Sequence, residues 1–133
     1  MISRDELLSI PATVRRLREE ETRIKIMRSK LYSPHGYDSS EKVHCSPGSQ
    51  TALADIVIDM EQKLDAKKTE LERLQTEAEA LILGTDLDGD ATILMLLRYT
   101  EGASWHQITE TIHYSPAAAY RAHKAALDTL FEK

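Results

Sequence analysis

The chain has 133 residues, 41% of them hydrophobic and 29% charged, which is typical of a soluble, helix-rich protein of one domain or of one small domain with an extension. The net charge of −5 gives no support for general binding to polyanions, so binding to nucleic acid would need a local basic patch. The single cysteine excludes a disulfide scaffold, and the lack of a signal-peptide core or of any run of about 18 apolar residues predicts no membrane attachment.

The first predicted element is an amphipathic helix of roughly twenty residues. We expect it to begin near Pro11, because proline is tolerated in the first turn of a helix. Its apolar row and the residues beside that row are Ile10, Val14, Leu17, Ile24, Met27 and Leu31. The opposite face is charged and consists of Arg15, Arg16, Arg18, Glu19, Glu20 and Arg23.

Residues 32–49 break this pattern. They are rich in Ser, Pro and Gly and show no periodicity, which predicts a loop. His35, His44 and Cys45 lie in it and are of the types that ligate zinc, but no CxxC pair accompanies them. We therefore expect a solvated loop without a metal.

The second predicted helix covers residues 50–83 and carries the clearest periodicity in the chain. Ser49 or Thr51 is expected to cap its start, and Gly84 its end. A row at alternating steps of three and four, which Lys67 interrupts, consists of Leu53, Val57, Met60, Leu64, Leu71, Leu74, Ala78 and Leu81. Such a row predicts a coiled-coil seam. The first predicted helix can fold back and cover part of this seam, but it is shorter than the second helix. Part of the seam is therefore left uncovered, and we expect the chain to form a homo-oligomer.

The segment GTDLDGD, residues 84–90, offers several residues that could cap the next helix: Thr85, Asp86, Asp88 and Asp90. A calcium loop that begins at Asp86 would need Gly at its sixth position and Glu at its twelfth. Those positions hold Ala91 and Leu97, so capping is the prediction.

Three short helices are predicted to follow, over residues 91–99, 104–112 and 116–133. In the first, the residues expected to be largely buried are Ile93, Leu94, Leu96 and Leu97. Ser104 is expected to cap the second helix and Ser115 the third, with Pro116 in the first helical position.

The last two helices have the pattern of a helix-turn-helix. Ile108 and Ile112 are expected to face inward, and Trp105 to close the core from the outer side. The predicted buried side of the last helix is Ala119, Tyr120, Leu127 and Leu130, and its predicted outer side is Ala117, Ala118, Arg121, His123 and Lys124. Arg121 and Lys124 share a face and could meet DNA phosphates. The alternative is a small helical bundle that does not bind DNA.

Residues 96–130 resemble the region-four type of helix-turn-helix of sigma-70 factors and, more closely, small phage and prophage proteins related to the ArpU and RinA late-transcription regulators. The matching residues are Arg98, Tyr99, Gly102, Ser104, Trp105, Ile108, Tyr114, Ser115, Tyr120, Arg121 and His123. The segment SSEKVHCSPGSQ is similar to the Ser-Pro loop that such proteins carry before their second helix. The resemblance implies two long N-terminal helices, a C-terminal DNA-binding domain and a place in the cytoplasm of a bacterial host cell.

The chain departs from this pattern in ways that bear on DNA binding. Thr109 replaces the usual alanine, His113 replaces a small corner residue, and positions 117 and 118 are both alanine. Residues 104–133 carry three acids and three bases, so their net charge is zero. We expect a weak reader as a monomer, in which alanines touch thymine methyl groups and dimerisation doubles the contacts.

The sequence thus predicts an all-α protein: a helical hairpin or coiled coil over residues 1–84, then a helix-turn-helix domain over residues 85–133. The expected function is a phage-type transcription regulator that binds DNA, RNA polymerase or both. The expected DNA-binding residues are Ser115, Ala117, Ala118, Arg121 and Lys124. We expect no catalytic residue, cofactor or metal. The alternative is a structural or assembly protein that uses the coiled coil for partner contacts.

Overall fold

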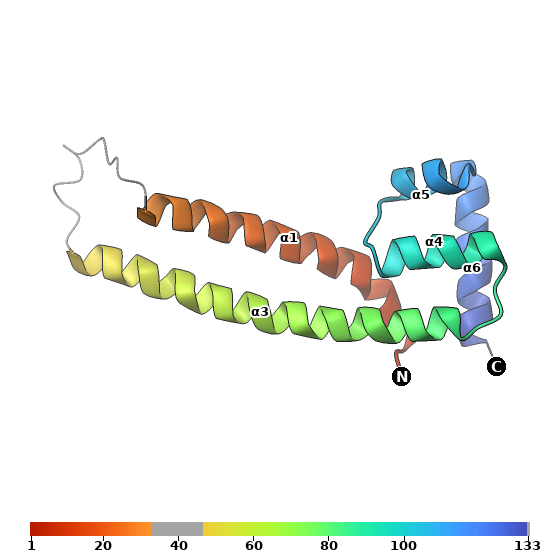
Figure 1. Ribbon diagram of the computed structural model, residues 1–133, viewed down its shortest axis with the longest axis horizontal. Coiled ribbons are helices and arrows are strands. Elements are labelled where there is room, and N and C mark those ends of the chain that lie inside the picture. Colours follow the sequence, from red (N-terminus) through yellow and green to blue (C-terminus); the bar gives the residue numbers. More distant parts are fainter. Residues whose placement is uncertain (33–46, 133) are drawn as a thin grey trace. The chain divides into compact units, whose positions relative to one another are not determined.

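The computed structural model describes residues 1–32 and 47–132, and every element in this part of the chain is an α-helix (Figure 1). The helices are α1 (Arg4–Tyr32), α3 (Pro47–Leu83), α4 (Gly89–Tyr99), α5 (Trp105–Ile112) and α6 (Pro116–Phe131). The predicted all-α class is therefore confirmed. None of these helices is long and apolar enough to cross a membrane.

The chain divides into two compact units. The first consists of Met1–Arg15 and Glu70–Lys133, and the second of Arg16–Thr69. The first unit thus contains residues on both sides of the predicted boundary between residues 84 and 85. The start of α1 and the end of α3 belong to the same unit as the three short helices.

Helix α1 begins earlier than predicted, and the expected start near Pro11 is wrong. The backbone N–H of Glu6 donates to Ser3 Oγ at 3.1 Å, and that of Ser3 donates to Glu6 Oε1 at 3.0 Å. This reciprocal pair is a capping box, which satisfies two backbone donors at a helix N-terminus. The helix therefore starts at Arg4, and Pro11 lies inside it.

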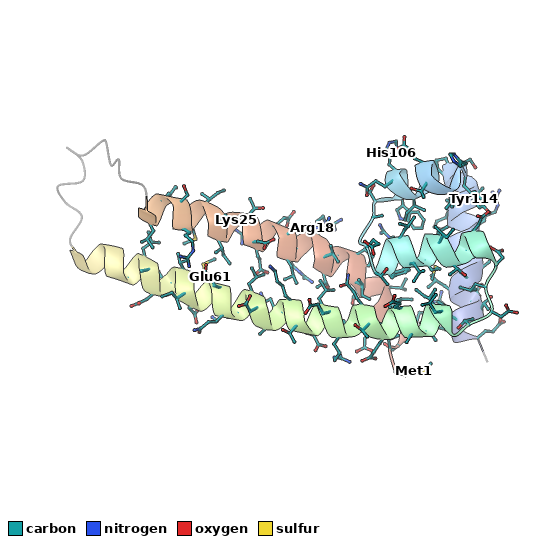
Figure 2. All side chains as sticks on the ribbon, viewed as in Figure 1. Met1, Arg18, Lys25, Glu61, His106 and Tyr114 are labelled. Atoms are coloured by element: carbon teal, nitrogen blue, oxygen red, sulfur yellow. The ribbon has the colours of Figure 1, made fainter. Side chains whose placement is uncertain are left out.

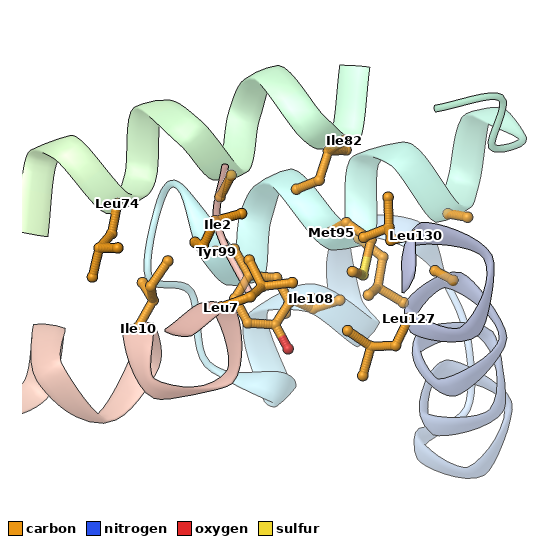
Figure 3. Close-up of a cluster of buried hydrophobic side chains, with 14 of the residues drawn as sticks. Ile2, Leu7, Ile10, Leu74, Ile82, Met95, Tyr99, Ile108, Leu127 and Leu130 are labelled. Atoms are coloured by element: carbon orange, nitrogen blue, oxygen red, sulfur yellow. The ribbon is translucent and has the colours of Figure 1, made fainter. Parts of the chain in front are cut away.

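The first unit has one hydrophobic core to which all five helices contribute. Figure 3 shows Leu7 and Ile10 of α1 near Tyr99 of α4, and Leu74 and Ile82 of α3 in the same cluster. Its buried members are Ile2, Leu7, Ile10, Val14, Leu74, Ala78, Ile82, Ala91, Leu94, Met95, Tyr99, Ile108, Ile112, Ala119, Ala126, Leu127 and Leu130. The three short helices thus share their core with the N-terminal residues.

In the second unit, segments of α1 and α3 lie side by side and run in opposite directions (Figure 2). Ion pairs connect them at Glu20–Lys67, Glu21–Lys68 and Arg28–Glu61, so residue numbers rise along one helix as they fall along the other. The buried apolar residues of this unit are Leu17, Ile24, Val57 and Leu64. Exposed ion pairs contribute little to stability, so this apolar row is the main source of the pairing free energy.

Helix α1 has 29 residues, which is longer than predicted, and it covers more of the α3 row than expected. Ile56 and Ile58 remain about half exposed in the second unit, but they lie two residues apart and therefore on different sides of α3. The leftover seam that motivated the oligomer prediction is smaller than the sequence suggested. Self-association remains a prediction.

Only one of the two predicted ends of α3 agrees with the structure. The helix ends at Leu83, and the N–H of Gly84 donates to the carbonyl oxygen of Ala80 at 2.9 Å, so the predicted end is confirmed. A Cβ at Gly84 would lie 2.9 Å from that oxygen, which explains the glycine. The start is Pro47, so Ser49 and Thr51 lie inside the helix and the predicted cap is wrong.

The candidate zinc ligands His35, His44 and Cys45 lie outside the described residues.

Helix α4 is capped by Asp88, whose Oδ1 accepts the N–H of Ala91 at 2.8 Å. Capping by the GTDLDGD segment is therefore confirmed. Leu94 is buried, as predicted, but Ile93 is 45% exposed, and the prediction for that residue is wrong. The buried positions of this helix are Ala91, Leu94, Met95 and Tyr99, a spacing that places Ile93 on the outer side.

Candidate functional site

Helix α5 is held at its start by a second capping box. Ser104 Oγ accepts the N–H of Gln107 at 3.2 Å, and Gln107 Oε1 accepts the N–H of Ser104 at 2.9 Å. Ile108 and Ile112 are buried, as predicted, and they anchor the helix to the core of the first unit. The orientation of α5 is thus fixed at both its cap and its apolar side.

The corner between α5 and α6 is built from three residues. His113 has φ 60° and ψ 42°, a left-handed conformation that ends α5. The hydroxyl of Tyr114 donates to Asp90 Oδ2 at 3.0 Å, which connects the corner to the first turn of α4. Ser115 caps α6, because its Oγ accepts the N–H of Ala118 at 3.1 Å, and Pro116 occupies the first turn. The predicted caps at Ser104 and Ser115 are confirmed.

The left-handed corner leads to a stability prediction. Among the described residues, His113 is the only non-glycine with positive φ, and Gly102 has φ 68° after α4. In this left-handed region a residue with a Cβ is destabilised by roughly 1–2 kcal/mol. Glycine has no such steric cost, but it loses more conformational entropy on folding than other residues do. We expect His113→Gly to raise the free energy of unfolding by up to about 1 kcal/mol, and Gly102→Ala to lower it by about the same amount. Urea denaturation of both variants checks this, and changes of equal sign would contradict it.

Helix α6 has one buried and one exposed side. Ala119, His123, Ala126, Leu127 and Leu130 are buried. The opposite side, here called the outer face, consists of Ala117, Tyr120, Arg121 and Lys124, all of them exposed. The side chains of Arg121 and Lys124 form no ion pair or hydrogen bond with the part of the chain that the structure describes.

The structure brings most of the predicted DNA-binding residues together on this outer face. Ala117, Arg121 and Lys124 are separated by one helical turn each. Ser115 is exposed at the N-cap position, with its Oγ already bonded to Ala118. Ala118 is half-buried and lies about a quarter turn away from Ala117, so it is beside the outer face.

The predicted exposures of two side chains on α6 are wrong, and each residue has the environment expected for the other. Tyr120, expected inside, is 64% exposed, and His123, expected outside, is only 9% exposed. The spacing of Ala119, Ala126 and Leu130 contained the signal for this, because a period of 3.6 residues through them passes through position 123. Because histidine is polar, position 123 was expected to be exposed despite this period.

His123 lies in a polar cluster of aromatic and basic side chains. Its Nε2 is hydrogen-bonded to the Tyr99 hydroxyl at 2.6 Å, and the two rings stack with centroids 5.8 Å apart. The Trp105 ring contacts the His123 ring edge-on at 4.9 Å, and the Arg98 guanidinium lies 4.9 Å from the Trp105 centroid. Arg98 also donates to the carbonyl oxygen of Ala103 at 3.3 Å. Trp105 therefore closes the core as predicted, but it does so against a histidine.

Burial sets the protonation of this cluster. Burial, together with the nearby guanidinium groups of Arg98 and Arg4, lowers the pKa of His123 from 6.5 to about 4. Burial also raises the pKa of Tyr99 to about 12. Near neutral pH both side chains of the pair are therefore uncharged.

An open groove lies between α5 and the start of α6. Its volume is about 340 Å³, and its lining residues are Trp105, His106, Thr109, Pro116 and Tyr120. His106 points outward from α5, with 80% of its side chain exposed (Figure 2). The groove therefore borders the outer face along the ring of Tyr120.

In the described part of the chain, no group of three or more His, Cys, Asp or Glu side chains is arranged to hold a metal ion. Two aspartates of the GTDLDGD segment form hydrogen bonds within the first unit. Asp88 caps α4, and Asp90 accepts the Tyr114 hydroxyl.

Comparison of the chain with protein-family models, with curated proteins and with solved structures finds no match.

Proposed function

We propose that the chain is a DNA-binding transcription regulator of the phage type, in which α5 and α6 form a helix-turn-helix and α6 enters the major groove. The observation that carries this proposal is the outer face of α6. It presents two cations that have no partner among the residues the structure describes, on a helix whose opposite side is fixed in the core. In helix-turn-helix proteins the second helix lies in the groove in this way.

The local charge of α6 supports the proposal although the chain as a whole is acidic. Residues 116–127 contain Arg121 and Lys124 and no acidic residue. The first acid on this helix is Asp128, whose Oδ1 lies 3.8 Å from the Arg4 guanidinium. The surface that would approach a phosphate backbone is therefore positive.

The start of α6 adds a second contact of the same kind. The N–H of Ala118 is satisfied by Ser115 Oγ, and Pro116 has no N–H. The N–H of Ala117 is left at the positive end of the helix dipole, where a phosphate oxygen could accept it. Arg121 follows one turn later on the same face.

A single unit of this kind makes few phosphate contacts, so the proposal includes self-association that presents two copies of α6 to two half-sites. It also includes RNA polymerase as a further partner, on the basis of the resemblance to late-transcription regulators. Without DNA binding, the alternative is an assembly protein that uses its long helices for partner contacts.

The proposal is tested by removing the two cations. We expect Arg121→Ala/Lys124→Ala to weaken binding to all DNA sequences and to reduce the log–log salt slope by up to about two, since each phosphate contact contributes about 0.9. The measurement is a salt titration of fluorescently labelled DNA selected by the unmodified protein, with circular dichroism as a check on folding.

A matched control removes the same charge elsewhere. Arg23 and Lys30 are exposed cations of α1 in the second unit, and Arg23→Ala/Lys30→Ala changes the net charge by the same amount. We expect this control to keep the salt slope of the unmodified protein. Equal slopes and affinities in all three proteins would remove α6 from the interface and favour the assembly role.

A further inference from the structure

Tyr120 has a position that a core residue of a helical bundle would not have. It is the most exposed Phe, Trp or Tyr side chain of the first unit, on the outer face of α6 and at the edge of the groove between α5 and α6. Its hydroxyl has no hydrogen-bond partner among the described residues. An exposed ring next to a groove, flanked by two cations, is typical of a contact surface.

The neighbours of Tyr120 define the chemistry of that surface. Ala117 lies one turn before it and presents only a methyl group. Pro116 and Trp105 add apolar surface along the groove. Arg121 and Lys124 lie beside this apolar facet and favour an anionic ligand. The combination of cations and an apolar facet fits duplex DNA, which presents phosphates beside the methyl groups of thymine in its major groove.

We infer that the ring of Tyr120 recognises the 5-methyl group of thymine, so that Tyr120 gives the protein its sequence preference while Arg121 and Lys124 position the helix. This inference rests on the proposed function and deepens it. Tyr120, Ala117 and Pro116 present only ring and aliphatic surface, and an apolar contact to a thymine methyl group needs no hydrogen-bonding side chain. The ring of Tyr120 makes the contact, so its hydroxyl is dispensable.

The experiment uses uracil in place of thymine, which removes the methyl group and keeps the base pairing. A DNA site is first selected with the unmodified protein. Affinities are then compared for the thymine and uracil forms of that site. We expect the unmodified protein to lose about fourfold in affinity for each contacted methyl, which follows from about 0.8 kcal/mol for one buried methyl-sized group.

Three variants separate the ring from its hydroxyl and from general effects on α6. Tyr120→Phe is expected to keep the preference for thymine over uracil. Tyr120→Ala is expected to bind both forms equally and to keep the salt slope of the unmodified protein. Thr129→Ala, which changes an exposed residue of α6 away from the outer face, is the control and is expected to keep the preference.

The outcomes separate this inference from the proposal on which it depends. If the unmodified protein binds no DNA, both fail. If it binds thymine and uracil sites equally, or if Tyr120→Ala keeps the preference, the inference is overturned and the proposed DNA binding stands. A preference that only Tyr120→Ala abolishes supports it.

Discussion

Replacing Leu94 by alanine is expected to lower the free energy of unfolding by about 2–5 kcal/mol, because the change leaves a cavity in a closely packed core. Leu94 is fully buried within the cluster that all five helices share. Its neighbour in sequence, Ile93, is 45% exposed, so Ile93→Ala is the matched control and is expected to cost less than about 1 kcal/mol. Small domains have a total stability of about 5–15 kcal/mol, so the first change can remove much of it.

The measurement is urea denaturation followed by two signals. Trp105 is the only tryptophan in the chain, so its fluorescence reports the first unit, and circular dichroism reports all helices. Because Ile2 and Leu7 share the core with Leu94, the N-terminal residues are expected to unfold together with the three short helices. Equal losses for Leu94→Ala and Ile93→Ala would contradict the assignment of the buried side of α4.

The elements of this fold were largely predictable from local signals. Capping serines and aspartates, together with apolar periodicity, located four of the five helices within a few residues. The start of α1 carried the same kind of signal, since Ser3 and Glu6 form an S-x-x-E box. The expected start near Pro11 did not include this box, and Pro11 lies inside α1 although proline there removes a backbone donor and its ring crowds the carbonyl group of the preceding turn.

The way the elements pack was harder to predict, because it depends on contacts between residues far apart in the chain. A pattern of apolar residues shows that one face of α1 is buried, but it does not show against which helix. Leu7 packs in the core with Leu94 and Ile108, and the division at Arg15 and Glu70 follows from this packing. Short helices add a second difficulty, since an error of one residue in phase exposes a residue such as Ile93.

At the candidate site, the exposure of the two cations was predictable, whereas the burial of His123 and the exposure of Tyr120 were not. Arg121 and Lys124 are exposed as expected, because burying an unpaired cation is costly. Residue type suggested that Tyr120 would be buried and His123 exposed. The Tyr99 hydroxyl reverses this by providing a hydrogen-bond partner that a buried histidine needs, and that partner lies on a different helix.

The protein is expected to lose stability as the pH falls from about 6.5 to about 4, and His123 is the reason. In the unfolded chain His123 takes up a proton near pH 6.5, whereas in the folded protein burial lowers its pKa to about 4. Within this window the unfolded state binds more protons, so the free energy of unfolding decreases as the pH decreases. The total loss from this residue is on the order of 3 kcal/mol, and below pH 4 it contributes no further loss.

The double variant Tyr99→Phe/His123→Phe isolates this effect. It keeps both rings in the core and removes both polar groups, so neither is left without a partner. Measured by urea denaturation at pH steps from 7 to about 4.5, its free energy of unfolding is expected to fall less than that of the unmodified protein. His106→Asn is the control, because its side chain is 80% exposed and its change should leave the pH dependence intact. Parallel curves for the unmodified protein and the double variant would show that His123 binds its proton equally in both states, which its burial against Tyr99, Trp105 and Arg98 does not allow.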